Sequence, residues 1–168
     1  SPVAEILRTE RLTLRPMALG DAPALHAFFS DPVAMAYWSP PHQSLAQTEA
    51  WVRGTVESPG DVTREYAIAL EGKVIGKAGL WKAPELGYFL VRTHWGQGLM
   101  TEALEALIPV LYETMGLETL TAEITPDNAV SAHLLQKLGF EEVRRGEKDH
   151  WDGTAWVDTA YYARPKNG

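Results

Sequence analysis

The sequence contains no cysteine, which excludes disulfide bonds, a thiol nucleophile and thiolate metal ligands. It has no apolar run of the length that spans a bilayer, and its first residues lack a basic stretch followed by an apolar one. We therefore expect a cytoplasmic protein without a membrane partner. Its five histidines show no spacing typical of metal ligands, so we expect no metal site.

Positive charge is also scarce, with 15 Lys and Arg against 22 Asp and Glu and a formal net charge of −7. A protein that binds nucleic acid through its phosphates needs a basic face, so we expect no nucleic-acid partner. An acidic surface attracts cations, among them the ammonium form of an amine. The same charge is equally consistent with a role in solubility alone.

A chain of 168 residues with 45% hydrophobic residues has the size and composition of one globular domain, so we expect a single domain over residues 1–168. Apolar periodicity predicts the order β-α-α-β-β-β-α-β-α-β-β, an α/β or α+β protein with a mixed sheet. The expected strands cover residues 11–15, 66–70, 74–81, 85–91 and 120–124, with two more after residue 139. The expected helices begin near residue 21, after residue 44 and after a glycine-containing turn at residues 96–98, and cover residues 129–138.

The glycine-containing turn joins the strand expected over residues 85–91 to a helix. The first N–H groups of a helix lack helical acceptors and, with the positive end of the helix dipole, bind phosphate oxygens. The turn therefore predicts a phosphate or pyrophosphate ligand, although purely structural turns share its pattern. Leu99 stands where a Walker A loop needs lysine, and Thr101 stands where a dinucleotide fingerprint needs its third glycine, so both motifs are excluded.

A second motif follows the strand expected over residues 120–124. Pro126 and Asp127 break the chain, and Asn128 and Ser131 are three residues apart, so both can point from one face of the next helix's first turn. Such residues also have structural roles, because Asn128 is a preferred N-cap and a serine hydroxyl can bond to the nearby backbone. Both interpretations stay open.

Six pieces of the sequence occur in one order: residues 9–16, 85–88, 95–103, Asn128 with Ser131, residues 137–140 and residues 156–162. Together they resemble the GNAT superfamily of acetyl-CoA-dependent N-acetyltransferases, and within it the RimJ/RimL branch that acetylates the N-termini of ribosomal proteins. The resemblance implies a mostly antiparallel central sheet flanked by helices, with a V-shaped split between the strands at residues 85–91 and 119–125. It also implies that a bulge near Leu90 and Val91 causes this split.

The resemblance implies direct transfer of an acetyl group from acetyl-CoA to a primary amine, either a protein N-terminal α-amine or a small amine. A non-catalytic acyl-CoA-binding module of the same fold is the alternative. The cofactor-binding residues that it implies, or that lie plausibly beside the phosphates, are Leu90, Val91, Arg92, Trp95, Gly96, Gln97, Gly98, Leu99, Met100, Thr101, Asn128, Ser131 and Lys137. Met100 departs from the family pattern, which has a small residue there. The protein is expected to be a monomer or a homodimer.

The resemblance assigns Ser131 a hydrogen bond to the departing sulfur. Three residues are candidates for the base that deprotonates the amine: Glu85, Asp149 and His150. An unperturbed histidine has a pKa of about 6.5, which suits an α-amine of pKa about 7.7–8.0 better than a lysine amine. Water or a backbone carbonyl is the alternative acceptor of this proton.

Tyr37 and Trp38 lie in the aromatic, proline-rich segment 31–43, and we expect them to bind the acceptor together with Tyr88. The alternative for Trp38 is packing in the core between two helices.

Overall fold

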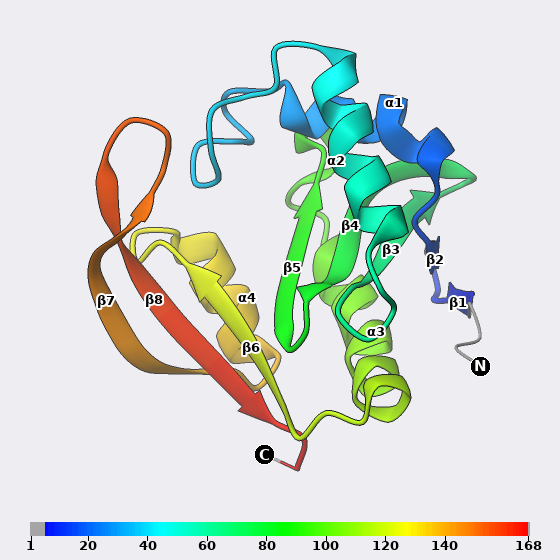
Figure 1. The fold of residues 1–168 in the computed structure, drawn as a ribbon. Helices are drawn as coiled ribbons and strands as arrows, with labels where there is room; N and C mark the ends of the chain where they lie inside the picture. Colours follow the sequence, from blue (N-terminus) through cyan, green and yellow to red (C-terminus); the bar gives the residue numbers. More distant parts are fainter. Residues whose placement is uncertain (1–5, 168) are drawn as a thin grey trace.

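The computed structural model describes residues 6–167 and has one eight-stranded sheet with helices on both faces (Figure 1). The strands are β1 (Leu7–Arg8), β2 (Leu12–Pro16), β3 (Arg64–Leu70), β4 (Lys73–Lys82), β5 (Glu85–Leu90), β6 (Thr119–Ile124), β7 (Glu141–Trp151) and β8 (Trp156–Pro165). The helices are α1 (Ala22–Phe29), α2 (Leu45–Glu57), α3 (Leu99–Met115) and α4 (Ala129–Lys137), with short 3₁₀ turns at Leu19–Asp21 and Arg92–His94. The predicted order of elements is confirmed, apart from the two-residue strand β1, which was not predicted. In this described part, no helix is both long and apolar enough to cross a membrane.

The sheet has the order β1-β2-β3-β4-β5-β6-β8-β7, and every neighbouring pair is antiparallel except β5 and β6. These two strands are parallel and share a single residue pair, Glu85 with Thr121, after which they diverge (Figure 1). The predicted V-shaped split is therefore confirmed. The predicted bulge at Leu90 and Val91 is wrong for the ladder between β4 and β5, whose register shift lies at the other end, between Leu80 and Lys82.

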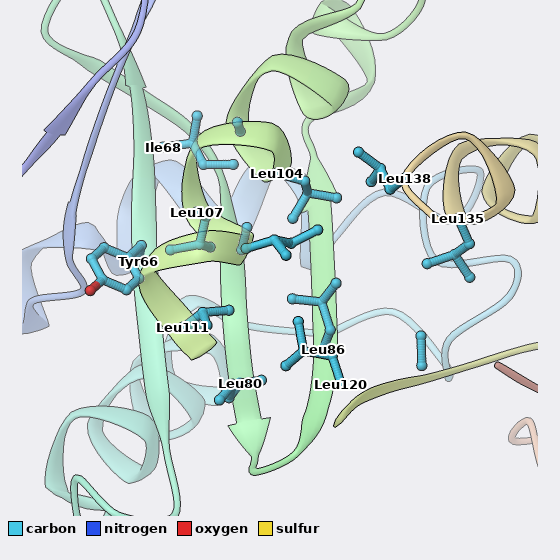
Figure 2. Packing of buried hydrophobic residues seen from close by; sticks show 14 of the residues in the cluster. Tyr66, Ile68, Leu80, Leu86, Leu104, Leu107, Leu111, Leu120, Leu135 and Leu138 are labelled. Atoms are coloured by element: carbon cyan, nitrogen blue, oxygen red, sulfur yellow. The ribbon is translucent and has the colours of Figure 1, made fainter. Parts of the chain in front are cut away.

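Two hydrophobic clusters lie on opposite faces of the sheet. The larger one joins α3 and α4 to the strands, and Leu104, Leu107 and Leu111 of α3 recur at helical spacing within it (Figure 2). The smaller one joins α1 and α2 to Phe89. Because successive side chains of a strand alternate between faces, Leu86, Tyr88 and Leu90 of β5 face α3 and α4, whereas Glu85, Gly87 and Phe89 face α1 and α2. The two faces of β5 thus present different sets of side chains, one toward α3 and α4 and the other toward α1 and α2.

Two histidines and a threonine tie α1 to α2 and to the segment between them. The hydroxyl of Thr48, which is fully buried, lies 2.7 Å from Nδ1 of His26 and 2.8 Å from Nδ1 of His42. A hydroxyl has one proton to donate, so at most one imidazole can accept it and at least one must donate to the hydroxyl oxygen. Burial, helped by the charge of His26, lowers the pKa of His42. The neutral form of His42 is therefore the one that the fold stabilises.

This arrangement predicts a loss of stability in acid. The unfolded chain binds the His42 proton more readily than the folded one, so the free energy of unfolding falls as pH drops below the ordinary histidine pKa of about 6.5. His42→Asn, which keeps a hydrogen-bonding group at the Nδ1 position, should flatten the dependence of Tm on pH between 7 and 5. His133→Gln, at an exposed position on α4, is the control and should keep the wild-type slope. Equal slopes in wild type and His42→Asn would contradict the assignment.

Candidate active site

A cavity of about 520 Å³ lies where β5 and β6 separate. Its aromatic lining comes from Tyr37, Trp38, Trp51, Trp81 and Tyr88, and its polar lining includes Lys77, Glu85, Glu123, Asn128, Ser131, His150 and Thr159. The cavity therefore brings together all three residues expected to bind the acceptor, both residues of the Asn128 motif and two of the three candidate bases. The third, Asp149, does not line it.

Ser131 and Tyr88 form a hydrogen-bonded hydroxyl pair at the cavity wall. Asn128 is the N-cap of α4, and its Oδ1 accepts a hydrogen bond from the Ser131 N–H at 3.2 Å, so the structural role that the sequence left open is present. That bond leaves the Ser131 hydroxyl for Tyr88. Burial raises the pKa of Tyr88 to about 12, so its phenol stays protonated at neutral pH. The pair can therefore donate a hydrogen bond to a group in the cavity.

Glu85 lies on β5 at the closed end of the split, opposite β6. Burial raises its pKa to about 7; a hydrogen bond with Trp81 opposes this rise, and a hydrogen bond and the charge of Glu123 add to it. A carboxyl group with a pKa near the working pH is suited to general acid–base catalysis, because both protonation states are well populated. The raised pKa of Glu85 therefore suits the role of the base.

The other two candidate bases lie on β7. The carboxylate of Asp149 accepts hydrogen bonds from the Thr159 hydroxyl at 2.6 Å and from the Tyr161 hydroxyl, and these bonds lower its pKa. The structure therefore does not favour Asp149 as the base. His150 lines the cavity and remains the second candidate for the base that deprotonates the amine.

The glycine-containing turn forms the start of α3. Gly96 and Gly98 have φ angles of +75° and +74°, a left-handed conformation that favours glycine. Gly98 is the N-cap without any side-chain cap, and the first helical hydrogen bond runs from the Glu102 N–H to the Gly98 carbonyl at 3.1 Å. The N–H groups of Leu99, Met100 and Thr101 therefore precede the helical ladder. They leave the start of this 17-residue helix suited to an anion.

Other predicted cofactor residues are already engaged within the protein. The N–H of Val91 donates to the Ile75 carbonyl at 2.8 Å, and the indole of Trp95 donates to the Leu90 carbonyl at 2.8 Å. Since backbone groups alternate along a strand, the N–H of Leu90 is the one directed toward the β6 side. Arg92 forms an ion pair with Asp31 through its Nε at 2.9 Å, and its role beside the phosphates stays a prediction. Lys137 is exposed at the end of α4 opposite Ser131.

Comparison with known proteins identifies the family. A model of the acetyltransferase (GNAT) domain matches residues 11–141. The chain is also 34% identical over 148 residues to p20 of Bacillus licheniformis, an uncharacterized N-acetyltransferase, and the match covers 82% of this chain and 83% of that protein. This chain belongs to the GNAT acetyltransferase family.

Solved GNAT structures share the fold. The RimL ribosomal L7/L12 α-N-protein acetyltransferase, in complex with coenzyme A, has a TM-score of 0.86 at 21% identity, with 96% of this chain and 98% of that chain covered. An acetyl transferase of Salmonella typhimurium that modifies the N-terminal serine of ribosomal protein L7/L12 has a TM-score of 0.85 at 22% identity, with 96% and 99% covered. The sequence resemblance to the GNAT superfamily is confirmed.

Sequence reasoning missed Arg11 as part of this GNAT site. Its guanidinium donates to the Gln97 carbonyl at 2.9 Å and to the Glu102 carboxylate at 2.7 Å, and Thr9 donates to the other Glu102 oxygen at 2.5 Å. This latch, formed by Thr9, Arg11 and Glu102, holds the turn from the N-terminal side of the chain and places a cation beside it. It also neutralises Glu102, whose charge would otherwise oppose an anion at the start of α3.

Glu123 and Lys77 were missed as well, although both line the cavity. Glu123 is two residues beyond Thr121, the β6 partner of Glu85, so a correct parallel register would have placed the two carboxyl groups near each other. Lys77 lies within a strand whose neighbours are buried, where sequence gives no sign that a charged side chain points inward. The position of both side chains in the cavity lining is set by tertiary contacts, which local sequence patterns do not reveal.

Proposed function

We propose that this protein transfers the acetyl group of acetyl-CoA to a primary amine, with the α-amine of a protein N-terminus as acceptor. The observation that carries the proposal is one cavity that joins a base, Glu85, to a hydroxyl pair, Tyr88 and Ser131, across the split between β5 and β6. The names of the GNAT relatives, N-acetyltransferases and ribosomal α-N-protein acetyltransferases, support the same reaction.

The start of α3 fits the diphosphate of acetyl-CoA. Its first N–H groups lack helical partners, and both glycines of the turn adopt the left-handed conformation. Within residues 6–167, nothing beyond the two chain neighbours of Gly96 lies within 4 Å of a Cβ built on it. Arg11, through its ion pair with Glu102, removes a negative charge that would oppose an anion at the same turn. Met100, which departs from the family pattern, is half-buried in the larger hydrophobic cluster, so its side chain is partly accommodated by the core. We therefore assign this turn to the diphosphate.

The chemistry needs two proton movements. Glu85 accepts a proton from the ammonium form of the acceptor, and the neutral nitrogen then attacks the thioester carbonyl carbon. The carbon–nitrogen bond forms and the carbon–sulfur bond breaks. As the amide forms, the second proton of the nitrogen passes, directly or through water, to the released thiolate, which leaves as the CoA thiol. The departing thiolate accepts a hydrogen bond from the pair of Tyr88 and Ser131. Because a thiol has a pKa of about 8.5, far below that of Tyr88, this bond stabilises the thiolate without transfer of the phenol proton.

The pKa of Glu85 favours an α-amine over a lysine side chain. The pKa of an α-amine, about 7.7–8.0, is roughly one unit above the pKa of Glu85, about 7, so proton transfer to Glu85 is only slightly unfavourable. The pKa of a lysine amine, near 10.4, is more than three units above that of Glu85, so the same transfer is much less favourable. Assays with peptides that have a free N-terminus should therefore show release of CoA thiol from acetyl-CoA. Assays with N-terminally blocked peptides that contain lysine should show none. Binding of CoA without thiol release from any amine would instead support the non-catalytic acyl-CoA-binding module.

Ser131→Ala should lower kcat by about tenfold to a hundredfold and leave the affinity for CoA within twofold of wild type. A hydrogen bond to a charged group is worth about 1.5–3 kcal/mol, and this one forms only as the thiolate develops. Tyr88→Phe should show a similar loss, and the double variant should add little to either. Steady-state kinetics and calorimetric titration with CoA give the two readouts.

Ser30→Ala is the matched control, because its hydroxyl bonds to the end of α1, in another part of the fold. Unchanged kcat in Ser131→Ala would remove the hydroxyl pair from the mechanism. A loss of CoA affinity equal to the loss of kcat would mean that Ser131 binds the cofactor and does not act on the leaving sulfur.

A further inference from the structure

A buried ion pair lies at the wall of the cavity, outside the machinery described so far. The Lys77 ammonium on β4 is 2.9 Å from the Glu65 carboxylate on β3, and their side chains are 2% and 1% exposed. Lys77 lines the cavity on the face of the sheet that carries α1 and α2. The ammonium is therefore within reach of a molecule that fills the acceptor side of the split.

The pair does not satisfy its own hydrogen-bonding capacity. An ammonium has three N–H donors, and the hydrogen bond that Lys77 makes among the described residues goes to Glu65 Oε2. Glu65 Oε1 is buried and has no hydrogen-bond partner in this part of the chain. Around the ammonium stand three rings, Trp38, Trp51 and Phe89, each with its centroid 5.8 Å from Nζ. These rings favour a cation but accept no conventional hydrogen bond.

Gly87 keeps the ammonium open to the cavity. A Cβ at this position of β5 would lie 3.1 Å from the Lys77 Nζ and 3.6 Å from the Trp81 ring, so glycine leaves the space in front of the ammonium free. Glu85 is two residues earlier on the same face of β5, about 7 Å along the strand. The base and the ammonium therefore face the same side of the cavity.

Stability alone does not account for this pair. Burial of two charges costs several kcal/mol per ion, and well-packed apolar residues in their place are often as stable or more stable. Since Glu65 neutralises Lys77, a full anion in the cavity would gain little from the pair. An uncharged oxygen would gain a hydrogen bond that the protein leaves unmade.

We propose that Lys77 is a specificity-determining residue of the acceptor site, whose ammonium donates a hydrogen bond to an uncharged carbonyl oxygen near the reacting amine. Trp38 and Trp51 pack around that group, and Glu65 holds the ammonium in place. This inference rests on the proposed function, because it assigns the acceptor to the same cavity. The acceptors that it selects are amines with an amide carbonyl a few bonds away, in preference to simple alkylamines.

The test compares phenylalaninamide with phenethylamine, which lacks the carboxamide. Wild type should show a kcat/KM at least tenfold higher for phenylalaninamide, and calorimetric titration into the protein–CoA complex should show the same preference in affinity. The double variant Lys77→Met/Glu65→Leu should lose the preference in affinity, through a higher KM for phenylalaninamide and an unchanged KM for phenethylamine. The part of the kcat/KM preference that comes from the lower pKa of the α-amine should remain. Both charges are removed together because a single change would leave the other buried without a partner.

Lys73→Met, which removes one exposed charge from the same strand, is the control and should keep the wild-type preference. Thermal unfolding should show the double variant to be at least as stable as wild type. Equal binding of the two amines by wild type, or a preference in affinity that is unchanged in the double variant, would overturn the inference. Absence of thiol release from any amine, with Lys77-dependent binding of phenylalaninamide intact, would overturn the proposed function and keep the subsite.

Discussion

Glu85→Gln is expected to lower kcat/KM for a peptide N-terminus by about 10²–10⁴-fold, the usual contribution of a positioned general base. The amide is nearly isosteric with the carboxylate, so the cavity keeps its shape while the proton acceptor is lost. Wild type should show a kcat/KM that rises with pH and levels off above an apparent pKa near 7, the pKa that burial gives Glu85. The variant should lack this rise, as a pH–rate profile between 5.5 and 9 would show.

Glu123→Gln is the informative companion. The Glu123 carboxyl group raises the pKa of Glu85 through its hydrogen bond and its charge, and these effects are smaller than that of burial. Removal of its charge should therefore lower the pKa of Glu85 and move the rising limb of the profile to lower pH, with the plateau rate largely kept. Persistence of the wild-type limb in Glu85→Gln, together with its loss in His150→Gln, would show that His150 is the base.

Local sequence patterns were sufficient for most elements of the fold. Strand β5 and helix α3 are long and strongly periodic, and Ser44 caps α2 by accepting a hydrogen bond from the Gln47 N–H, as its position predicts. The hairpin of β3 and β4 turns at Glu71 and Gly72, both of which have positive φ. These features depend on residues close together in the chain, so they can be predicted from a single sequence.

The split in the sheet was predicted from the family resemblance, but the cause that the resemblance implied for it was wrong. The bulge that the resemblance implied near Val91 is absent from the β4–β5 ladder, where the Val91 N–H still bonds to Ile75. β5 and β6 are parallel and pair at Glu85 alone, and beyond this pair they diverge. Pairing between strands that are separated by a helix cannot be deduced from either strand by itself.

The candidate-site residues that the sequence indicated lie in local motifs, whereas those that it did not indicate are brought in from distant parts of the chain. The turn at Gly96 and Gly98 and the pair Asn128 and Ser131 are local motifs. Arg11 donates a hydrogen bond to the carbonyl of Gln97, which is 86 residues away in the chain. Asp31 forms an ion pair with Arg92, which is 61 residues away. Charge partners of this kind depend on the packing of distant segments, so exposed basic residues near a motif are weak predictors of a phosphate contact.

Gly98→Asp should reduce the affinity for CoA by at least about a hundredfold. The added carboxylate stands at the N-cap of α3, where it accepts hydrogen bonds from the same N–H groups that the diphosphate needs. Its charge also repels the diphosphate, by about 1–4 kcal/mol per pair of charges at 4 Å in a setting between water and a protein surface. Together these effects exceed the roughly 2.7 kcal/mol that a hundredfold loss represents.

Gly98→Asn separates charge from shape. Asparagine and aspartate have the same size, and both tolerate the positive φ of this position better than other residues with a Cβ. The Asn variant should lose about tenfold or less, because it competes for the N–H groups without repelling the diphosphate. Both variants should unfold slightly below the wild-type Tm and to the same extent, since the positive φ strains a residue with a Cβ and the side-chain cap offsets only part of that strain. Equal CoA affinities in the two variants, measured by calorimetric titration, would mean that no diphosphate lies at the start of α3.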